Sequence, residues 1–188
     1  MTRYFNYEKA LLIIDYTNDF IADDGALSCQ APGQALENNL VALAEQYLAN
    51  GDYVILPTDT HRLNDKYHPE SKLFPPHNIE KTWGHELYGK LNDWYQANKN
   101  NELVWQYAKD RYSSFKNTGL DNFLRTRQID TLCLTGVCTD ICVLHTAVDA
   151  YNLNYHLEIP KNAVASFDQT GHEWALRHFE NSLGAKVY

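Results

Sequence analysis

The sequence predicts an α/β protein built as a three-layer, doubly wound sheet that is mostly parallel and has helices on both faces. Two observations lead to this prediction. Short runs rich in apolar, branched or aromatic residues recur along the chain, and segments with apolar residues at helical spacing separate them. A strand followed by a helix, repeated several times, is typical of a parallel sheet that is covered on both faces.

The strands are predicted from five short apolar runs, and the C-terminal AKVY (185–188) is a candidate sixth strand. The five runs are residues 10–15 (ALLIID), 52–59 (DYVILPTD), 102–109 (ELVWQYAK), 130–136 (DTLCLTG) and 154–160 (NYHLEIP).

Helices are predicted for the segments between these runs. They cover residues 33–50, 86–97, 117–127, 139–152 and 168–182. Residues 60–85 break the alternation, because they are polar, hold three of the six prolines and follow neither period. A connection of that length without regular structure is usually functional or disordered.

Composition limits the classes of function. A chain of 188 residues that is 44% hydrophobic can bury one sizeable core, so we expect a single domain over residues 1–188. The net charge of -8, without a cluster of Lys and Arg, argues against nucleic-acid and anionic-membrane partners and favours a small-molecule substrate. The early apolar run 10–14 is too short for a membrane span or a signal peptide, and four cysteines without a secretory signal indicate reduced thiols. We therefore expect a cytoplasmic protein.

Polar residues stand where four of the predicted strands end. Asp15 closes the first strand, Asp59 the second and Lys109 the third, and the fourth continues through TGVCTD into a helix whose first turn contains Cys142. Ligands of open parallel sheets bind outside the carboxyl ends of the strands. A single polar strand end is ordinary surface, but four together predict a site at this edge.

The positions of Cys138 and Cys142 relative to the predicted helix indicate different roles for the two residues. If Thr139 is the N-cap, Cys142 takes the third helical position, where free amides and the helix dipole favour a thiolate. We expect Cys142 to be the nucleophile, and the backbone N–H groups of Cys138 and Cys142 to bind the developing oxyanion. Cys133 is expected to be a small core residue, and Cys29 has no assigned role. Without its neighbours, Cys142 would more commonly be a buried structural thiol.

A thiol nucleophile needs a base and a positive neighbour. Asp15 is the candidate that accepts the thiol proton, and Lys109 is the candidate that pairs with Asp15 and favours the ionised forms of both groups. This set contains no histidine, so the histidines of the long loop are free for another task.

A metal site is predicted from the start of that loop. Asp59, His61, His68, Glu70 and His77 offer oxygen and nitrogen donors that suit Zn, Fe or Mn with open positions. The spacing matches no closed zinc finger, and a solvated loop that contains histidines is the alternative interpretation.

Two stretches resemble a known family. TGVCTDICVLHTA (135–147), followed by VDAYN, resembles the signature of the isochorismatase-like cysteine hydrolases. DTHRLNDKYHPESKLFPPH (59–77), with an Asp closing the first strand and a Lys after the third, is similar to nicotinamidases, including bacterial enzymes that also hydrolyse pyrazinamide. The resemblance covers nearly the whole chain, from Ala10 to Lys186.

The resemblance also implies roles for individual residues. The implied triad is Asp15, Lys109 and Cys142. The implied metal ligands are Asp59, His61, Glu70 and His77, with Glu70 preferred to His68 because the local pattern is most similar to nicotinamidases with a glutamate there. A cis peptide is implied between Val137 and Cys138. Independently of the resemblance, Phe20, Phe74 and Tyr112 are the candidate apolar walls for a flat ring because they are nearest in sequence to the motifs, and each could equally be an ordinary core residue. Val137 is a further substrate-contact candidate.

The expected reaction is hydrolysis of nicotinamide to nicotinic acid and ammonia through a Cys142 thioester, with the pyridine nitrogen directed toward a divalent metal, zinc before iron or manganese. The resemblance further implies a homo-oligomer that recycles nicotinamide toward NAD. Three alternatives stay open: a sister hydrolase acting on another small amide or an enol ether, a metal-dependent protein that binds a pyridine without turnover, and a redox protein using Cys138 and Cys142.

Overall fold

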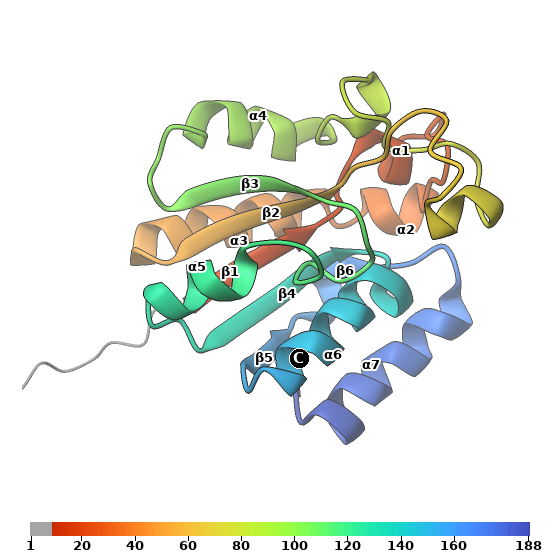
Figure 1. Cartoon of the computed structure of the whole chain (residues 1–188). Helices are drawn as coiled ribbons and strands as arrows, with labels where there is room; N and C mark the ends of the chain where they lie inside the picture. The colour runs from red at the N-terminus through yellow and green to blue at the C-terminus, as the bar shows by residue number, and fades with distance from the viewer. Residues whose placement is uncertain (1–8) are drawn as a thin grey trace, which may run out of the picture.

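The computed structural model describes residues 9–188 as a seven-stranded sheet with helices on both faces (Figure 1). Every recorded strand pair is parallel, in the order β3-β2-β1-β4-β5-β7, with β6 paired to the end of β4. The strands are β1 (Lys9–Ile14), β2 (Tyr53–Asp59), β3 (Val104–Lys109), β4 (Thr131–Val137), β5 (His156–Ile159), β6 (Val164–Ala165) and β7 (Lys186–Val187). The predicted fold class is confirmed.

The helices divide between the two faces of this sheet. They are α1 (Asn18–Ile21), α2 (Gln30–Gln34), α3 (Glu37–Asn50), α4 (Gly89–Asn98), α5 (Leu120–Thr126), α6 (Leu144–Asn152) and α7 (Gln169–Leu183). One hydrophobic cluster contains core residues of α3 and α4, and the other contains those of α5, α6 and α7. Figure 1 shows the same division, with α3 and α4 on one side and α5 to α7 on the other.

The alternation of side chains along β1 explains why both faces are covered. Leu11 and Ile13 pack into the first cluster, and Ala10, Leu12 and Ile14 pack into the second. All five are at most 1% exposed. Burial of a leucine or isoleucine side chain contributes about 2 kcal/mol, so a strand that is apolar on both faces is stable only between two helical layers.

Several predicted boundaries differ from the observed ones. The helix expected over 33–50 is two helices, α2 and α3, and Pro32 and Gly33, both poor helix formers, lie in the short first one. The helix expected over 139–152 opens with a π-helical turn, η3 (Thr139–Val143), before α6. The candidate C-terminal strand is present as β7.

The long connection 60–85 is largely irregular, as expected, but contains two 3₁₀ turns, η1 (Pro69–Lys72) and η2 (Trp83–His85). A further 3₁₀ turn, η4 (Lys161–Ala163), precedes β6. No helix among the described residues is long and apolar enough to cross a membrane. The single domain over 1–188 stays a prediction, and its first eight residues lie outside the described part of the chain.

The neighbouring strands β1 and β4 set the position of the site. The chain leaves β1 toward β2 on one side and leaves β4 toward β5 on the other, which makes their carboxyl ends a topological switch point. Gly136 has a φ of +100°, and a Cβ there would lie 2.0 Å from the carbonyl oxygen of Ile14. Glycine at 136 therefore permits the close approach that brings the turn after β4 beside Asp15.

Candidate active site

Asp15, Lys109 and Cys142 meet in a buried cluster at this switch point. The Lys109 ammonium lies 2.8 Å from Asp15 Oδ2 and donates to Cys142 Sγ at 3.6 Å. It also donates to the carbonyl oxygen of Arg111 at 3.1 Å and lies 3.7 Å from Asp59 Oδ1. Three strand ends and the turn after β4 therefore supply one set of interacting groups, as the sequence predicted for their placement.

Asp15 is held by the backbone as well as by Lys109. Its φ of 56° is left-handed, a conformation that Asp tolerates at a cost of about 1 kcal/mol. Its amide donates to the Pro57 carbonyl at 3.1 Å, and its Oδ1 accepts from the Asp59 amide at 2.7 Å. With Oδ2 on Lys109, both oxygens of the carboxylate are oriented.

The protonation states fit a proton acceptor beside a proton donor. Burial raises the pKa of Asp15 to about 6, against the opposing effect of Lys109. Burial also raises the pKa of the Cys142 thiol well above its usual value, although Lys109 lowers it. At neutral pH Asp15 is therefore mostly ionised and Cys142 is a neutral thiol.

Two expectations about the turn before α6 were wrong. Cys138 occupies the N-cap position, and the Thr139 hydroxyl is paired with His172 Nδ1 at 2.8 Å instead of capping the helix. The helix end does not keep Cys142 ionised, because burial raises the pKa of its thiol well above the usual value. The peptide between Val137 and Cys138 is cis, as the resemblance implied.

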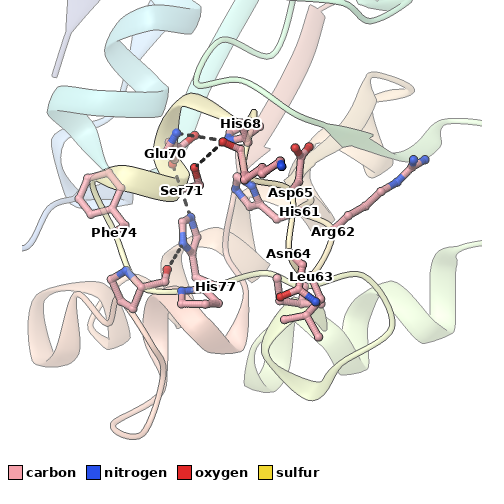
Figure 2. Close-up of a pocket in the computed structure, with 14 residues that line it drawn as sticks. His61, Arg62, Leu63, Asn64, Asp65, His68, Glu70, Ser71, Phe74 and His77 are labelled. Atoms are coloured by element: carbon pink, nitrogen blue, oxygen red, sulfur yellow. Dashed lines mark hydrogen bonds and ion pairs between the residues drawn. The ribbon is translucent and has the colours of Figure 1, made fainter.

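The candidate metal ligands lie next to this cluster. His61 Nε2 is 2.8 Å from Asp59 Oδ2, and His77 Nε2 is 3.5 Å from both Asp59 Oδ2 and Glu70 Oε2. Donor atoms of Asp59, His61 and His77 lie within 4.8 Å of one another. Figure 2 shows Glu70, His61 and His77 directed toward one another from different parts of the loop.

His68 and Glu70 differ in how their donor atoms are used. Both belong to a second donor group with His61. The two ring nitrogens of His68 are already engaged, Nδ1 with the Glu70 amide at 3.3 Å and Nε2 with the Asp110 carbonyl at 2.7 Å. The Glu70 side chain is buried and faces His77. The geometry thus favours Glu70 as the fourth donor.

The four residues fit a divalent metal. His77 Nδ1 contacts the Pro75 carbonyl at 2.8 Å, which directs Nε2 to the site, and the buried Nε2 has no hydrogen-bond partner within residues 9–188. Burial lowers the pKa of His77, but the carboxylates of Asp59 and Glu70, each 3.5 Å from Nε2, outweigh it and raise the pKa to about 10. Burial raises the pKa of Asp59, yet Lys109, His61 and His77 hold it below its ordinary value. Two carboxylates thus share a position that attracts positive charge.

Asn78 supports this donor set and was missed from the sequence. It is fully buried, its side-chain amide lies 3.4 Å from Asp59 Oδ2, and its Oδ1 accepts from the Thr17 hydroxyl at 2.8 Å. Its carbonyl accepts from the His61 amide at 2.9 Å. An asparagine in an irregular loop carries no sequence signal beyond its place after His77.

A cavity of about 410 Å³ opens onto the candidate metal ligands and is lined by loop residues that include His61, Glu70, Phe74 and His77 (Figure 2). Among the substrate-contact candidates, Phe74 lines this cavity, and the Phe20 ring lies 5.6 Å from that of His77.

The other two substrate-contact candidates lie elsewhere around the site. Tyr112 lies in a neighbouring groove beside His145 and Glu70. Val137 is completely buried in β4.

Comparison with known proteins gives the family. The model of the isochorismatase domain matches residues 9–187. The chain belongs to the isochorismatase family. It is 56% identical, over 96% of this chain and 98% of the relative, to an uncharacterized isochorismatase family protein, PncA, of Bacillus subtilis (strain 168).

Solved structures agree with this assignment. The crystal structure of a nicotinamidase/pyrazinamidase, PncA, from Bacillus subtilis has a TM-score of 0.94 and 54% identity, and the match covers 96% of this chain and 98% of that one. The nicotinamidase SaPncA of Staphylococcus aureus has a TM-score of 0.83 and 44% identity with the same coverage of both chains.

Proposed function

We propose that this protein hydrolyses nicotinamide to nicotinic acid and ammonia, with Cys142 as nucleophile. The observation that carries the proposal is the buried contact of Lys109 with both Asp15 and Cys142. Similarity to the nicotinamidases of Bacillus subtilis and Staphylococcus aureus supports the choice of substrate.

Asp59, His61, Glu70 and His77 would hold a divalent metal, and a set of two nitrogens and two carboxylates suits zinc first, with iron or manganese as alternatives. When bound, the metal supplies an open position for the pyridine nitrogen and so fixes the ring of the substrate. Phe20 and Phe74 are the proposed walls for that ring, and Tyr112 and Val137 are proposed to complete its surroundings.

The first chemical stage is acylation of Cys142. The Asp15 carboxylate takes the proton of the Cys142 thiol, and the sulfur attacks the carboxamide carbon. The N–H groups of Cys138 and Cys142 donate to the oxyanion, and each such donor is worth about 3 kcal/mol. Asp15 then gives its proton to the leaving ammonia.

The second stage releases the acid. Asp15, ionised again, takes a proton from water as that water attacks the thioester carbonyl, and nicotinic acid leaves while Cys142 regains its proton. Lys109 keeps Asp15 available as a base in both stages, because its charge opposes the rise in the pKa of Asp15 that burial causes.

The proposal is tested with protein loaded with zinc, iron or manganese. Nicotinamide should yield ammonia and nicotinic acid in equal amounts, and acid quenching should trap an acyl group on the Cys142 peptide. Benzamide, which has the same carboxamide but no ring nitrogen, should show a KM higher by at least about 10-fold, corresponding to the loss of at least about 1.4 kcal/mol of binding. Equal KM values would contradict ring binding at the metal, and no ammonia from nicotinamide with any of the metals would contradict the proposed substrate.

The cytoplasmic location, the homo-oligomer and the recycling of nicotinamide toward NAD belong to the same proposal and rest on resemblance.

A further inference from the structure

Two thiols that the proposed mechanism does not use lie in contact. Cys29 Sγ and Cys138 Sγ are 3.5 Å apart, although 109 positions separate them in the sequence. Both residues are buried, at 2% and 5% exposure. The Cys142 sulfur contacts Lys109. Among the described residues, the sulfur that Cys138 contacts is that of Cys29.

Both thiols are held in place by their backbones. The Cys29 amide donates to the Phe20 carbonyl at 2.7 Å. A Cβ at Gly33 would lie 2.9 Å from Cβ of Cys29, so glycine at 33 leaves the room that Cys29 fills. The Cys138 carbonyl accepts from the amides of Ile141 and Val143 at 3.0 and 3.2 Å. Hydrogen bonds therefore hold the backbone of each cysteine, and the two sulfurs lie opposite each other.

We propose that Cys29 and Cys138 are a reversible oxidation site, in which a hydroperoxide joins the two thiols as a disulfide. One thiol, as its thiolate, attacks a peroxide oxygen, the O–O bond breaks, and a sulfenic acid and water form when hydrogen peroxide is the oxidant. The second sulfur attacks the sulfenic sulfur, the S–O bond breaks, and a second water leaves. Two thiols lose two electrons and two protons, and one peroxide is reduced to two waters.

The bond requires the two cysteines to move toward each other. A disulfide places its sulfurs about 2.05 Å apart, so the two sulfurs close by about 1.5 Å from their 3.5 Å separation. Part of this displacement falls on Cys138. The consequence for activity rests on the proposed function, in which the Cys138 N–H binds the oxyanion. A misplacement of about 1 Å in such a site costs about 100-fold in rate.

The reaction conditions follow from the surroundings of Cys138. The hydrogen bond with Cys29 and then burial raise the pKa of the Cys138 thiol well above its usual value. Oxidation is therefore run at about pH 8.5, where more of a high-pKa thiol is ionised than at neutral pH.

The test compares the parent protein with Cys29→Ala and with Cys133→Ala. Cys133 is the matched control, because it is also a buried thiol and has no sulfur within contact distance among the described residues. Each protein is treated with hydrogen peroxide, blocked with iodoacetamide, digested without reduction and mapped by mass spectrometry. We expect a peptide pair linked through Cys29 and Cys138 in the parent and in Cys133→Ala, and its loss on treatment with dithiothreitol. Cys29→Ser repeats the test if Cys29→Ala folds poorly.

The rate of ammonia release is measured separately from the formation of the disulfide. The linked fraction should release ammonia about 100-fold more slowly, and dithiothreitol should restore that part of the rate. Cys29→Ala should not show this reversible loss of activity. It should still lose activity more slowly through oxidation of Cys142. Two results would overturn the oxidation site. In one, Cys29 and Cys138 stay free after a treatment that has oxidised Cys142. In the other, a disulfide joins Cys138 to Cys142. A Cys29–Cys138 link that leaves ammonia release unchanged would overturn the effect on activity and the oxyanion role of Cys138, while the link itself would stand.

Discussion

Removal of the buried ammonium in Lys109→Met should raise the pKa of Asp15 and so deprive the reaction of its base at neutral pH. At the observed 2.8 Å and an effective dielectric constant of about 20, the attraction between the two charges is about 6 kcal/mol. One pKa unit corresponds to about 1.4 kcal/mol, so the pKa of Asp15 should rise by up to about 4 units from about 6. The ionised fraction at pH 7, and with it kcat/KM, should fall by about 100- to 1,000-fold.

The assay is ammonia release from nicotinamide by metal-loaded protein across a range of pH. The parent should approach a plateau above neutral pH, whereas Lys109→Met should gain activity steadily as the pH rises toward 9, because its Asp15 ionises only there. Lys161→Met, which removes an exposed lysine, should behave as the parent does. A lysine that served only packing would lower activity equally at every pH.

Stability should fall with activity in this variant, because Lys109 is completely buried and its loss leaves Asp15 and Asp59 without their counter-charge. Removal of one partner from a buried ion pair costs about 3 kcal/mol or more, or about 9 °C in Tm for a chain of this size. An unchanged kcat/KM at pH 7 in folded, metal-loaded Lys109→Met would refute the reasoning.

Three further predictions concern the base and the metal site. Lowering the pH should reduce kcat/KM, and the decrease should reach tenfold per unit at least about one unit below the pKa of Asp15, because Asp15 must be ionised to act. This pKa is about 6 without metal and is lowered by a bound cation, and a pH-independent rate down to pH 4 would contradict the prediction. His61→Ala should contain less bound metal, measured by inductively coupled plasma mass spectrometry, and should have a much higher KM for the substrate. The control His156→Ala, which changes an exposed histidine, should keep the metal. An equal metal content in the two variants would remove His61 from the site. In metal titrations followed by Tm, Glu70→Gln should weaken affinity by more than about 10-fold and His68→Gln by less; the reverse order would make His68 the ligand.

The sequence predicted most of the sheet, because strands buried on both faces are continuous apolar runs that stand out from polar helices. It also predicted the grouping of Asp15, Asp59 and Lys109, since parallel strands end at one edge and the residue that closes each strand is readable. The two-residue strand β6 and the four-residue helix α1 were missed because elements that short leave no period to detect.

Effects of burial, and contacts between segments far apart in the chain, could not be predicted from the sequence. Thr139 has an ordinary N-cap pattern, but its hydroxyl is taken by His172, which reaches it from α7. The raised pKa of Cys142 depends on how completely the surrounding structure excludes water, which local spacing does not report. Cys29 had no role in the sequence, because its partner Cys138 becomes a neighbour only after the chain has folded.

The central claim, that Cys142 is the nucleophile of an amide hydrolysis, is tested most directly by ammonia release from nicotinamide by metal-loaded parent protein, Cys142→Ala and Cys138→Ala. We predict release by the parent and by Cys138→Ala, which keeps its backbone N–H, and none above background from Cys142→Ala with the same metal content and Tm. Release from Cys142→Ala at a rate close to that of the parent would contradict the account.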